Sequence, residues 1–373
     1  MTLVNRRLAL LCIAWLLALP AADTAAQQPS PFDRWDADGD GKLTRQEVPE
    51  GARRLFDRVD ANGDGTLSRE EDIAFRNRQP PAAQAESRVS AAIRVEADIP
   101  YAGSDNPRQR LDLFLPKSPK GDGPLPVVVF IHGGAWRAGD RRGGWGRVAP
   151  YVESGHYAGV SVGYRLTDEA IWPAQIHDCK AAIRWIRANA EKYRIDPERI
   201  GVFGSSAGGH LVAMLGTSGD VKELEGDLGE HDSVSSRVAC VVDEFGPSEL
   251  LAMGQYPSRM NHDAADSPES LLIGGATQEN KDRARAASPI TYVSADDPPF
   301  LVIHGTKDPL VPFNQSERLR DALKAAGAEA LLIPIEGGGH GGFRNPEVPE
   351  RTRRFFDKHL RGETVEIPTS PLE

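Results

Sequence analysis

Cysteine is scarce in this sequence, with 3 residues among 373. Cys12 lies near the N-terminus and lacks small residues immediately before it, which disfavours a lipoprotein anchor. Cys179 lies on a predicted helix face and Cys240 in an apolar strand run, where buried free thiols are the commoner state. A disulfide between these two is the alternative, but we expect no disulfide framework and a core large enough to be stable without one.

Positive charge is also in deficit. The sequence has 44 Lys and Arg against 54 Asp and Glu, a formal net charge of −10. This balance argues against a nucleic-acid partner and is compatible with neutral or sparingly soluble substrates. With 373 residues, the chain has room for one large domain and a small appendage.

The apolar run from Leu8 to Leu19 is too short for a comfortable membrane span. It follows Arg6 and Arg7, and small residues continue through Ala26, which is the layout of a secretory signal peptide. We therefore expect residues 1–26 to be removed and the protein to be exported, to the periplasm or outside the cell. The mature chain would then have no stable membrane span.

Two segments between Phe32 and Arg76 have the spacing of the EF-hand calcium loop. Ca²⁺ prefers about six to eight hard oxygens, which Asp or Asn side chains, one backbone carbonyl and a bidentate terminal Glu supply at fixed positions. An acidic surface turn is the alternative for one such loop, but two complete matches argue against it. The predicted ligands are Asp36, Asp38, Asp40, Lys42 and Glu47 in the first loop and Asp60, Asn62, Asp64, Thr66 and Glu71 in the second.

The two loops are close together in sequence, so the helices between them must be short. We expect a compact, all-α EF-hand pair at residues 30–76, in which Leu43 and Leu67 pair the loops through a short β bridge. Because an exported protein meets plentiful Ca²⁺, constitutive loading with a structural or attachment role is expected rather than switching. Residues 77–92 are rich in Pro, Ala, Gln and Ser, which is typical of a linker.

A G-x-S-x-G motif from Gly204 to Gly208 lies between the apolar run Ile200 to Phe203 and the helix-like stretch His210 to Leu215. A strand, a sharp turn and a helix in this order form the context of a nucleophile elbow. The flanking residues must be small because the turn holds its central Ser in a strained conformation. Ser206 is therefore the candidate nucleophile, with a serine in an ordinary glycine turn as the alternative.

Two candidate partners follow in the order acid, then His. Asp308 comes after the strand-like run Phe300 to Ile303, and His340 after the run Leu331 to Ile335. Parallel strands share one carboxyl edge, so residues at these exits can converge. In that arrangement His340 takes the proton of Ser206 while Asp308 fixes the imidazole tautomer. The reserve candidates for the acid are Asp243 and Glu244, after an earlier strand.

The apolar run Val127 to Ile131 ends in His132-Gly133-Gly134, which resembles a loop that supplies backbone N–H groups to an oxyanion hole. Glycine suits this loop because the peptide must approach the developing negative oxygen closely. Ala207, at the start of the following helix, is the expected second donor. The candidate oxyanion residues are Gly133, Gly134 and Ala207, and His132 is expected to be a structural residue of the loop.

Between about Ile93 and Arg361 the chain resembles bacterial α/β-hydrolases of the BD-FAE type, which are related to hormone-sensitive-lipase-like, acetyl-xylan and feruloyl esterases. The motifs that carry the resemblance are HGGAWRAGDRR from His132, YRL from Tyr164, WPAQIHDCKAAIRWIRANA from Trp172, IDPERIGVFGSSAGGHL from Ile195, SPITYVSADDPPFLVIHGTKDPLVP from Ser288 and GGGHGG from Gly337. The resemblance implies ester hydrolysis without a catalytic cofactor. It also implies the triad Ser206, Asp308 and His340 and the oxyanion residues Gly133, Gly134 and Ala207.

Apolar strand runs alternate with amphipathic helical stretches, which predicts an α/β protein with a doubly wound, mostly parallel sheet. We place this α/β-hydrolase domain at residues 93–362, with a poorly ordered polar tail at 363–373. The segment from Ser248 to Asp282 interrupts the alternation and is expected to form a short cap. Candidates to face the acyl group, with ordinary cap packing as the alternative, are Phe245, Met253, Tyr256 and Met260.

Together these features predict an exported serine carboxylesterase with calcium-binding EF-hands. The expected substrates are small-molecule or carbohydrate esters, carrying short-chain, acetyl or feruloyl groups. A serine peptidase of the prolyl-oligopeptidase type shares the elbow and the triad order, but the sequence has no repeat array for the propeller usual there. The second alternative is an inactive hydrolase fold that serves as a binding module.

Overall fold

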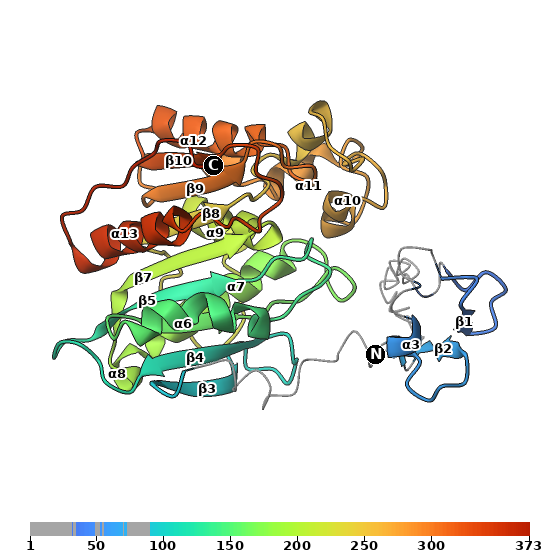
Figure 1. Cartoon of the computed structure of the whole chain (residues 1–373), viewed down its shortest axis with the longest axis horizontal. Helices are drawn as coiled ribbons and strands as arrows, with labels where there is room; N and C mark the ends of the chain where they lie inside the picture. Colours follow the sequence, from blue (N-terminus) through green and yellow to red (C-terminus); the bar gives the residue numbers. More distant parts are fainter. Residues whose placement is uncertain (1–31, 33–34, 49–52, 54–55, 70, 73–89) are drawn as a thin grey trace, which may run out of the picture. The chain divides into compact units, whose positions relative to one another are not determined.

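The computed structural model describes residues 32, 35–48, 53, 56–69, 71–72 and 90–373. The predicted signal peptide and most of the predicted linker lie outside the described residues. The chain divides into two compact units, residues 1–77 and 78–373 (Figure 1). Among the described residues, no helix combines the length and the apolar character needed to cross a membrane.

The small unit contains two short strands, β1 (Lys42–Thr44) and β2 (Thr66–Ser68), and helix α3 (Phe56–Val59). The strands pair antiparallel with Leu43 opposite Leu67, so the predicted bridge between the loops is confirmed. This bridge adds a two-stranded sheet to a unit expected to be all-α. A small apolar core consists of Phe32, Leu43, Val48, Phe56, Val59 and Leu67.

The large unit is built on one eight-stranded sheet with the order β10-β9-β8-β7-β5-β6-β4-β3. The six strands from β5 to β10 run parallel, and β3 and β4 join antiparallel at one edge. The predicted doubly wound, mostly parallel sheet is confirmed. The strands are β3 (Ile93–Pro100), β4 (Arg110–Pro116), β5 (Leu125–Ile131), β6 (Ala158–Val162), β7 (Ile195–Ser205), β8 (Cys240–Glu244), β9 (Phe300–Gly305) and β10 (Ala330–Ile335).

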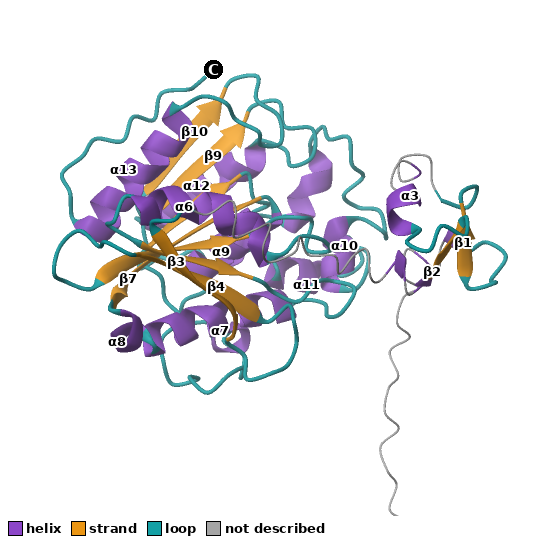
Figure 2. Ribbon diagram, turned by 60° about the horizontal axis from the view of Figure 1, so that its bottom comes forward, coloured by secondary structure: helices purple, strands orange, loops and turns teal. Residues whose placement is uncertain are grey.

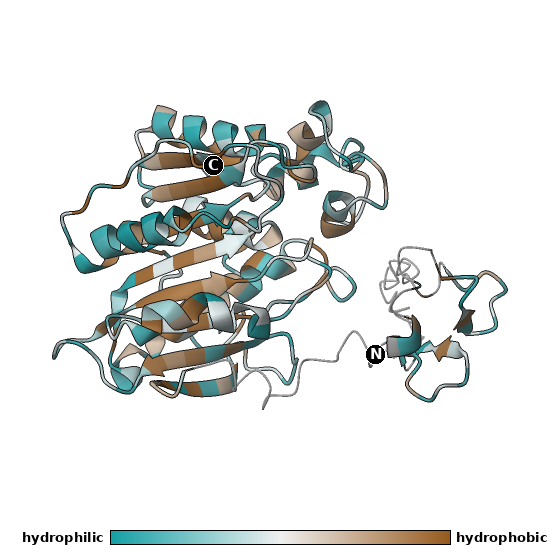
Figure 3. Ribbon diagram, viewed as in Figure 1, coloured by the Kyte–Doolittle hydropathy of each residue, from teal (hydrophilic) through white to brown (hydrophobic). Residues whose placement is uncertain are grey.

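Helices cover both faces of this sheet (Figures 1 and 2). Helices α6 (Trp145–Glu153) and α13 (Glu347–Arg361) pack on one face. Helices α7 (Ala174–Ala188), α9 (Ala207–Thr217) and α12 (Asn314–Ala326) pack on the other. Because strands such as β5 are buried on both faces, they are apolar throughout rather than alternating, and they appear brown along their length in Figure 3.

The remaining helical segments are short. Those between β8 and β9 form the predicted cap. They are η3 (Leu250–Gln255), α10 (Pro268–Ile273) and α11 (Lys281–Ala286), with η4 (Pro289–Tyr292) leading into β9. Elsewhere lie η1 (Arg141–Gly144), α8 (Ala190–Tyr193) and η2 (Lys222–Leu224). Cys179 and Cys240 are free, buried thiols, as expected.

The C-terminal segment packs on the sheet, so the prediction of a poorly ordered tail is wrong. Leu372 is only 5% exposed and belongs to the core cluster beneath α13. Its backbone forms a parallel bridge with Ile335 at the edge strand β10, and Arg351 of α13 donates to the carbonyls of Pro368 and Ser370. Ile367 of the same segment also packs against this cluster, so two apolar residues in a mostly polar segment attach it to the core.

Candidate active site

The G-x-S-x-G segment forms a sharp turn between β7 and α9. Ser206 has φ 56° and ψ −121°, a conformation that non-glycine residues adopt rarely and only where the surroundings hold them. A Cβ placed on Gly208 would lie 2.1 Å from the carbonyl oxygen of Ile131, and one on Gly204 would lie 2.4 Å from the carbonyl oxygen of Gly208. Both flanking positions therefore require glycine, and Ser206 is presented at the carboxyl edge of the sheet.

The structure brings the three predicted side chains into one hydrogen-bonded line. His340 Nε2 lies 2.9 Å from Ser206 Oγ, and His340 Nδ1 lies 2.7 Å from Asp308 Oδ2. Ser206 follows β7, Asp308 follows β9 and His340 follows β10, so the shared edge of the parallel strands accounts for the convergence.

Asp308 is held by contacts to both of its carboxylate oxygens. Oδ1 accepts the backbone N–H groups of Leu310 (2.8 Å) and Val311 (3.0 Å), and Oδ2 faces the imidazoles of His340 and His304. Burial raises the pKa of Asp308, but the hydrogen bonds from His304, His340 and the backbone outweigh it and hold the pKa well below its ordinary value. Asp308 is therefore a carboxylate throughout the neutral range.

His304 is a partner of Asp308 that the sequence reasoning missed. Its Nε2 lies 3.1 Å from Asp308 Oδ2 and 3.0 Å from the carbonyl oxygen of Val311, while Nδ1 lies 2.7 Å from Ser316 Oγ. The ring is fully buried. The available signal was a titratable residue inside the otherwise apolar strand β9, four positions before the candidate acid.

The alternative candidates for the acid, Asp243 and Glu244, have other partners. Glu244 accepts hydrogen bonds from Ser205 Oγ (2.6 Å) and Arg147 (2.6 Å), and its backbone carbonyl accepts the N–H of Ser206 (2.9 Å). Asp243 is fully buried, which raises its pKa to about 7, and it accepts the N–H of Gly246. In the described residues neither carboxylate is hydrogen-bonded to His340.

The loop after β5 lies directly against Ser206. A Cβ on Gly133 would be 2.5 Å from the carbonyl oxygen of Ser205 and 3.4 Å from Cβ of Ser206, and Gly134 has φ +117°. Ala207 is the first residue of α9. Within the described part of the chain, the backbone N–H groups of Gly133, Gly134 and Ala207 donate to no other protein group. These three donors are therefore available to a ligand.

Two histidines fix this loop without joining the line of Ser206. His132 stacks on Tyr164 with ring centroids 4.3 Å apart, and burial lowers its pKa, which fits the structural role expected for it. Farther along the loop, Trp136 Nε1 donates to His210 Nδ1 (3.2 Å). His210 Nε2 in turn donates to the carbonyl of Ala287 (2.7 Å), and burial lowers its pKa to about 4.

Of the four candidates to face the acyl group, Phe245 contacts His340. Its ring meets the ring of His340 edge-on at 4.8 Å. Met253 is fully buried in the cap, Met260 is half-buried and Tyr256 is 39% exposed. Beside Phe245 opens a cavity of about 570 Å³. Its lining includes Arg147, Tyr151, Glu244, Gly341, Phe343 and Arg353.

The two predicted calcium loops have matching internal hydrogen bonds. Glu47 accepts the N–H groups of Ala37 (3.1 Å) and Thr44 (2.7 Å), and Glu71 accepts those of the equivalent residues Ala61 and Ser68 (both 2.9 Å). The hydrogen bonds with Thr44 and Ser68 lower the pKa values of Glu47 and Glu71, so both stay ionised.

In the first loop the carboxylates of Asp36, Asp38 and Asp40 offer oxygens within 4.8 Å of one another. In the second loop Asp60, Asn62 and Asp64 occupy the same positions. Both donor sets consist of hard oxygens, with backbone carbonyls at Lys42 and Thr66, and this chemistry fits Ca²⁺.

Two family models match the chain. The BD-FAE model matches residues 111–323, which is more than half of the sequence, and a model described as EF hand matches residues 52–71. The EF-hand match contains the second predicted calcium loop and ends before the sheet of the large unit begins.

Several esterases are similar in sequence. The chain is 33% identical over 238 residues to Esterase LipC of Mycobacterium tuberculosis, and the match covers 64% of this chain and 58% of LipC. It is 30% identical over 279 residues to the isoprenylcysteine alpha-carbonyl methylesterase ICME of Arabidopsis thaliana, covering 74% of this chain and 60% of ICME. The chain thus spans less than two thirds of these relatives.

Solved esterase structures are also similar. A truncated form of a carbohydrate esterase from gut microbiota superposes with a TM-score of 0.67 at 37% identity, covering 72% of this chain and 96% of that one. A thermophilic esterase from Thermogutta terrifontis with bound propionate superposes with a TM-score of 0.57 at 25% identity, covering 73% of this chain and 94% of that one.

Proposed function

Because the chain belongs to the BD-FAE family, we propose that it hydrolyses carboxylic esters with Ser206 as the nucleophile. The observation that carries the proposal is the line from Ser206 Oγ through the His340 ring to Asp308 Oδ2, with spacings of 2.9 and 2.7 Å. A hydroxyl is a weak nucleophile unless a base takes its proton, and this geometry places a base within reach.

The reaction has two halves. Ser206 Oγ attacks the ester carbonyl while His340 Nε2 takes the hydroxyl proton, and His340 then returns this proton to the departing alcohol. In the second half His340 takes a proton from water, which attacks the acyl-enzyme carbonyl, and His340 then returns this proton to Ser206 Oγ as the bond to the acyl group breaks and the carboxylic acid leaves. Asp308 remains ionised because its pKa is depressed, so it holds the ring orientation and stabilises the imidazolium in both halves.

The unpaired backbone N–H groups around Ser206 form the oxyanion hole in this proposal. The developing negative oxygen of each tetrahedral intermediate would accept from Ala207 and from Gly133 or Gly134. The contact of Gly133 with the nucleophile supports this, as does the position of Ala207 at the positive end of the α9 dipole. The catalytic cycle then requires no cofactor.

We infer that the substrates are short-chain or carbohydrate esters. The similar solved structures include a carbohydrate esterase and an esterase with bound propionate, which supports both classes. The two loops of the small unit would hold Ca²⁺ in a structural or attachment role. Residues 1–26 would direct export before removal, so the mature enzyme would act in the periplasm or outside the cell.

The test is hydrolysis of p-nitrophenyl acetate and butyrate by wild type and by Ser206→Ala. We expect Ser206→Ala to lose about 10³-fold or more in kcat/KM while it keeps its fold and thermal midpoint. A fluorophosphonate should label wild type and not the variant. Activity retained by Ser206→Ala would refute the assignment, and an unlabelled, inactive wild type would support the binding-module alternative.

Substrate class is tested with acetylated xylan, feruloylated polysaccharide, simple short-chain esters and a peptide panel, each with and without a calcium chelator. Turnover of an ester class that depends on Ser206 supports the proposal. Preferential cleavage of peptides would instead favour the prolyl-oligopeptidase-like alternative.

A further inference from the structure

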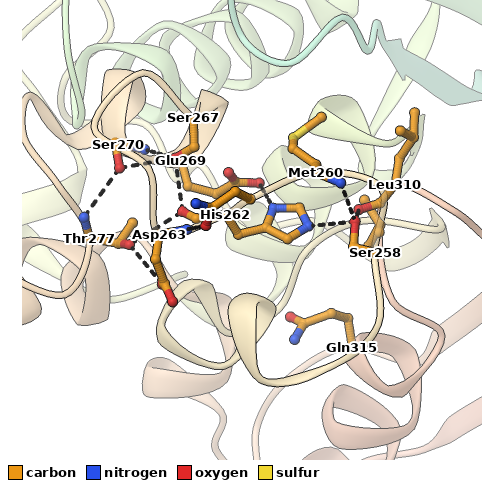
Figure 4. A network of polar contacts seen from close by, with 12 residues as sticks. Ser258, Met260, His262, Asp263, Ser267, Glu269, Ser270, Thr277, Leu310 and Gln315 are labelled. Carbon is orange, nitrogen blue, oxygen red and sulfur yellow. Dashed lines mark hydrogen bonds and ion pairs between the residues drawn. The ribbon is translucent and has the colours of Figure 1, made fainter.

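The cap contains a second line of Ser, His and acid side chains, separate from the one at Ser206. His262 Nε2 lies 3.1 Å from Ser258 Oγ, and His262 Nδ1 lies 3.0 Å from Glu269 Oε1 (Figure 4). His262 is 1% exposed and Glu269 is 3% exposed. Burying two ionisable side chains costs free energy unless they are paired and hydrogen-bonded. The contacts of this pair therefore indicate its role.

The arrangement around Ser258 does not suit a nucleophile. Its Oγ lies 3.1 Å from the carbonyl oxygens of both Pro309 and Leu310, and it accepts the backbone N–H of Met260 (3.1 Å). A hydroxyl has one hydrogen to donate, and here that hydrogen points to a backbone carbonyl. The oxygen is therefore engaged on every side and is not free to attack a substrate.

The same reasoning fixes the direction of the bond from His262. Since the Ser258 hydroxyl donates to a carbonyl, His262 Nε2 must donate to Ser258 Oγ, and Glu269 holds the opposite edge of the ring through Nδ1. The backbone of His262 is anchored as well, because its carbonyl accepts from Ser267 Oγ (2.9 Å). Ser258 is thus held rigidly from within the cap.

The carbonyls that Ser258 contacts belong to the loop of the catalytic acid. Arg259 adds a backbone hydrogen bond to the Pro309 carbonyl (2.8 Å), so two consecutive cap residues hold this loop. The N–H groups of the next residues, Leu310 and Val311, are the two that bind Asp308 Oδ1. The cap therefore binds the carbonyl groups of Pro309 and Leu310. The N–H groups of the same segment bind the carboxylate of Asp308.

We propose that Ser258, buttressed by the buried His262–Glu269 pair, is a positioning residue that fixes the Pro309–Leu310 segment and thereby the carboxylate of Asp308. This inference rests on the proposed function, since it concerns the acid of that catalytic line. Its consequence is that the cap helps to position the catalytic carboxylate. A small displacement of Asp308 would misalign His340 and lower turnover without weakening substrate binding.

The test compares Ser258→Ala with a matched control, Ser154→Ala. Ser154 is also a half-buried serine whose hydroxyl donates to a backbone carbonyl (Tyr151, 2.5 Å) and accepts a backbone N–H (His156, 3.2 Å). It lies after α6, away from the Asp308 loop. We expect Ser258→Ala to lower kcat about tenfold with KM changed less than about twofold, and Ser154→Ala to leave both unchanged.

A second arm places Ser258→Ala in the Asp308→Asn background, with acylation followed in a single turnover. If Ser258 acts through the Asp308 carboxylate, its removal should cost little more once that carboxylate is gone. Equal kcat values for Ser258→Ala and Ser154→Ala, or a tenfold loss that persists in the Asp308→Asn background, would overturn the inference. Absence of any Ser206-dependent turnover in wild type would instead refute the proposed function.

Discussion

The backbone N–H of Ser206 donates to the backbone carbonyl of Glu244 at 2.9 Å and so connects this strained residue to the neighbouring strand. The side chain of Glu244 repeats the connection, because it accepts the hydroxyl of Ser205 and the guanidinium of Arg147. The elbow is therefore braced from β8 as well as by its own glycines.

Replacement of Glu244 should weaken this brace. We expect Glu244→Ala to lower the free energy of unfolding by about 1–2 kcal/mol, because Ser205 and the partly exposed Arg147 each lose a hydrogen-bond partner. Chemical denaturation and ester turnover measure the two effects. Wild-type stability and kcat in Glu244→Ala would show that the glycine contacts alone hold the elbow.

A methyl group at Gly208 should be poorly tolerated. Since its Cβ would meet the Ile131 carbonyl oxygen at 2.1 Å, the backbone must shift, and we expect Gly208→Ala to cost about 2 kcal/mol or more of stability and most of the activity. Gly143→Ala is the control, because a Cβ there meets nothing within 4 Å. Thermal melts and kcat should separate the two variants, and equal behaviour would contradict the predicted clash.

The depressed pKa of Asp308 gives a pH-dependent contribution to stability. The folded-state pKa lies below the unfolded value of about 3.9, so this contribution is present above about pH 4 and is lost as the pH falls toward the folded-state pKa. Wild type minus Asp308→Asn stability, measured by urea titration, should therefore be constant from pH 5 to 8 and shrink in more acidic buffer. A difference that grows on acidification would mean the opposite sign of the shift.

A further prediction about Asp308 concerns its neighbour His304. His304 is one of the groups that lower the pKa of Asp308, and it also contacts Oδ2, so His304→Phe should raise that pKa and leave the carboxylate less firmly positioned. Steady-state ester hydrolysis at neutral pH, where Asp308 stays ionised, should therefore show a lower kcat for His304→Phe than for wild type. An unchanged kcat would show that the remaining contacts of Asp308 suffice.

If the two loops bind Ca²⁺, the affinity of each loop should depend on its last acidic residue. Glu47→Gln and Glu71→Gln should each weaken Ca²⁺ binding by about tenfold or more, because the bidentate carboxylate is lost. Asp57→Asn, an exposed acid of α3 outside both loops, is the matched control. Calorimetric titration at fixed ionic strength measures the affinities, and equal affinities in all three variants would refute the assignment of ligands.

The C-terminal anchor should be measurable in stability alone. Leu372→Ala should lower the free energy of unfolding by about 2–3 kcal/mol, because a buried leucine leaves a cavity. Pro371→Ala, one residue earlier and exposed, should have little effect. Denaturation curves that coincide for the two variants would show that the packing of Leu372 contributes little.

Much of the site was predictable because the sheet is parallel. Continuous apolar runs marked β5 to β10, and the loops at their carboxyl ends had to meet at one edge, so Ser206, Asp308 and His340 could be placed together without coordinates. The glycines at 204 and 208 added the elbow. These inferences depend on local patterns and on one topological rule.

The features that could not be predicted depend on tertiary contacts, which leave no periodic pattern in the sequence. The edge strands β3 and β4 were not identified as separate elements. His304 belongs to an apolar run, and its role follows only from its distance to Asp308. Leu372 lies in a polar stretch, and only tertiary packing makes it a core residue. The link from His262 to Asp308 crosses two loops far apart in sequence.

The close approach of Gly133, Gly204 and Gly208 to neighbouring carbonyls bears on how this chain can be re-engineered. No side chain fits at these three positions, so a library that randomises them would yield mostly unfolded proteins. New ester preferences must instead come from the cavity beside Phe245, whose lining includes Tyr151 and Phe343. Directed evolution of this scaffold would therefore hold the elbow constant and diversify this lining, including the segment after His340.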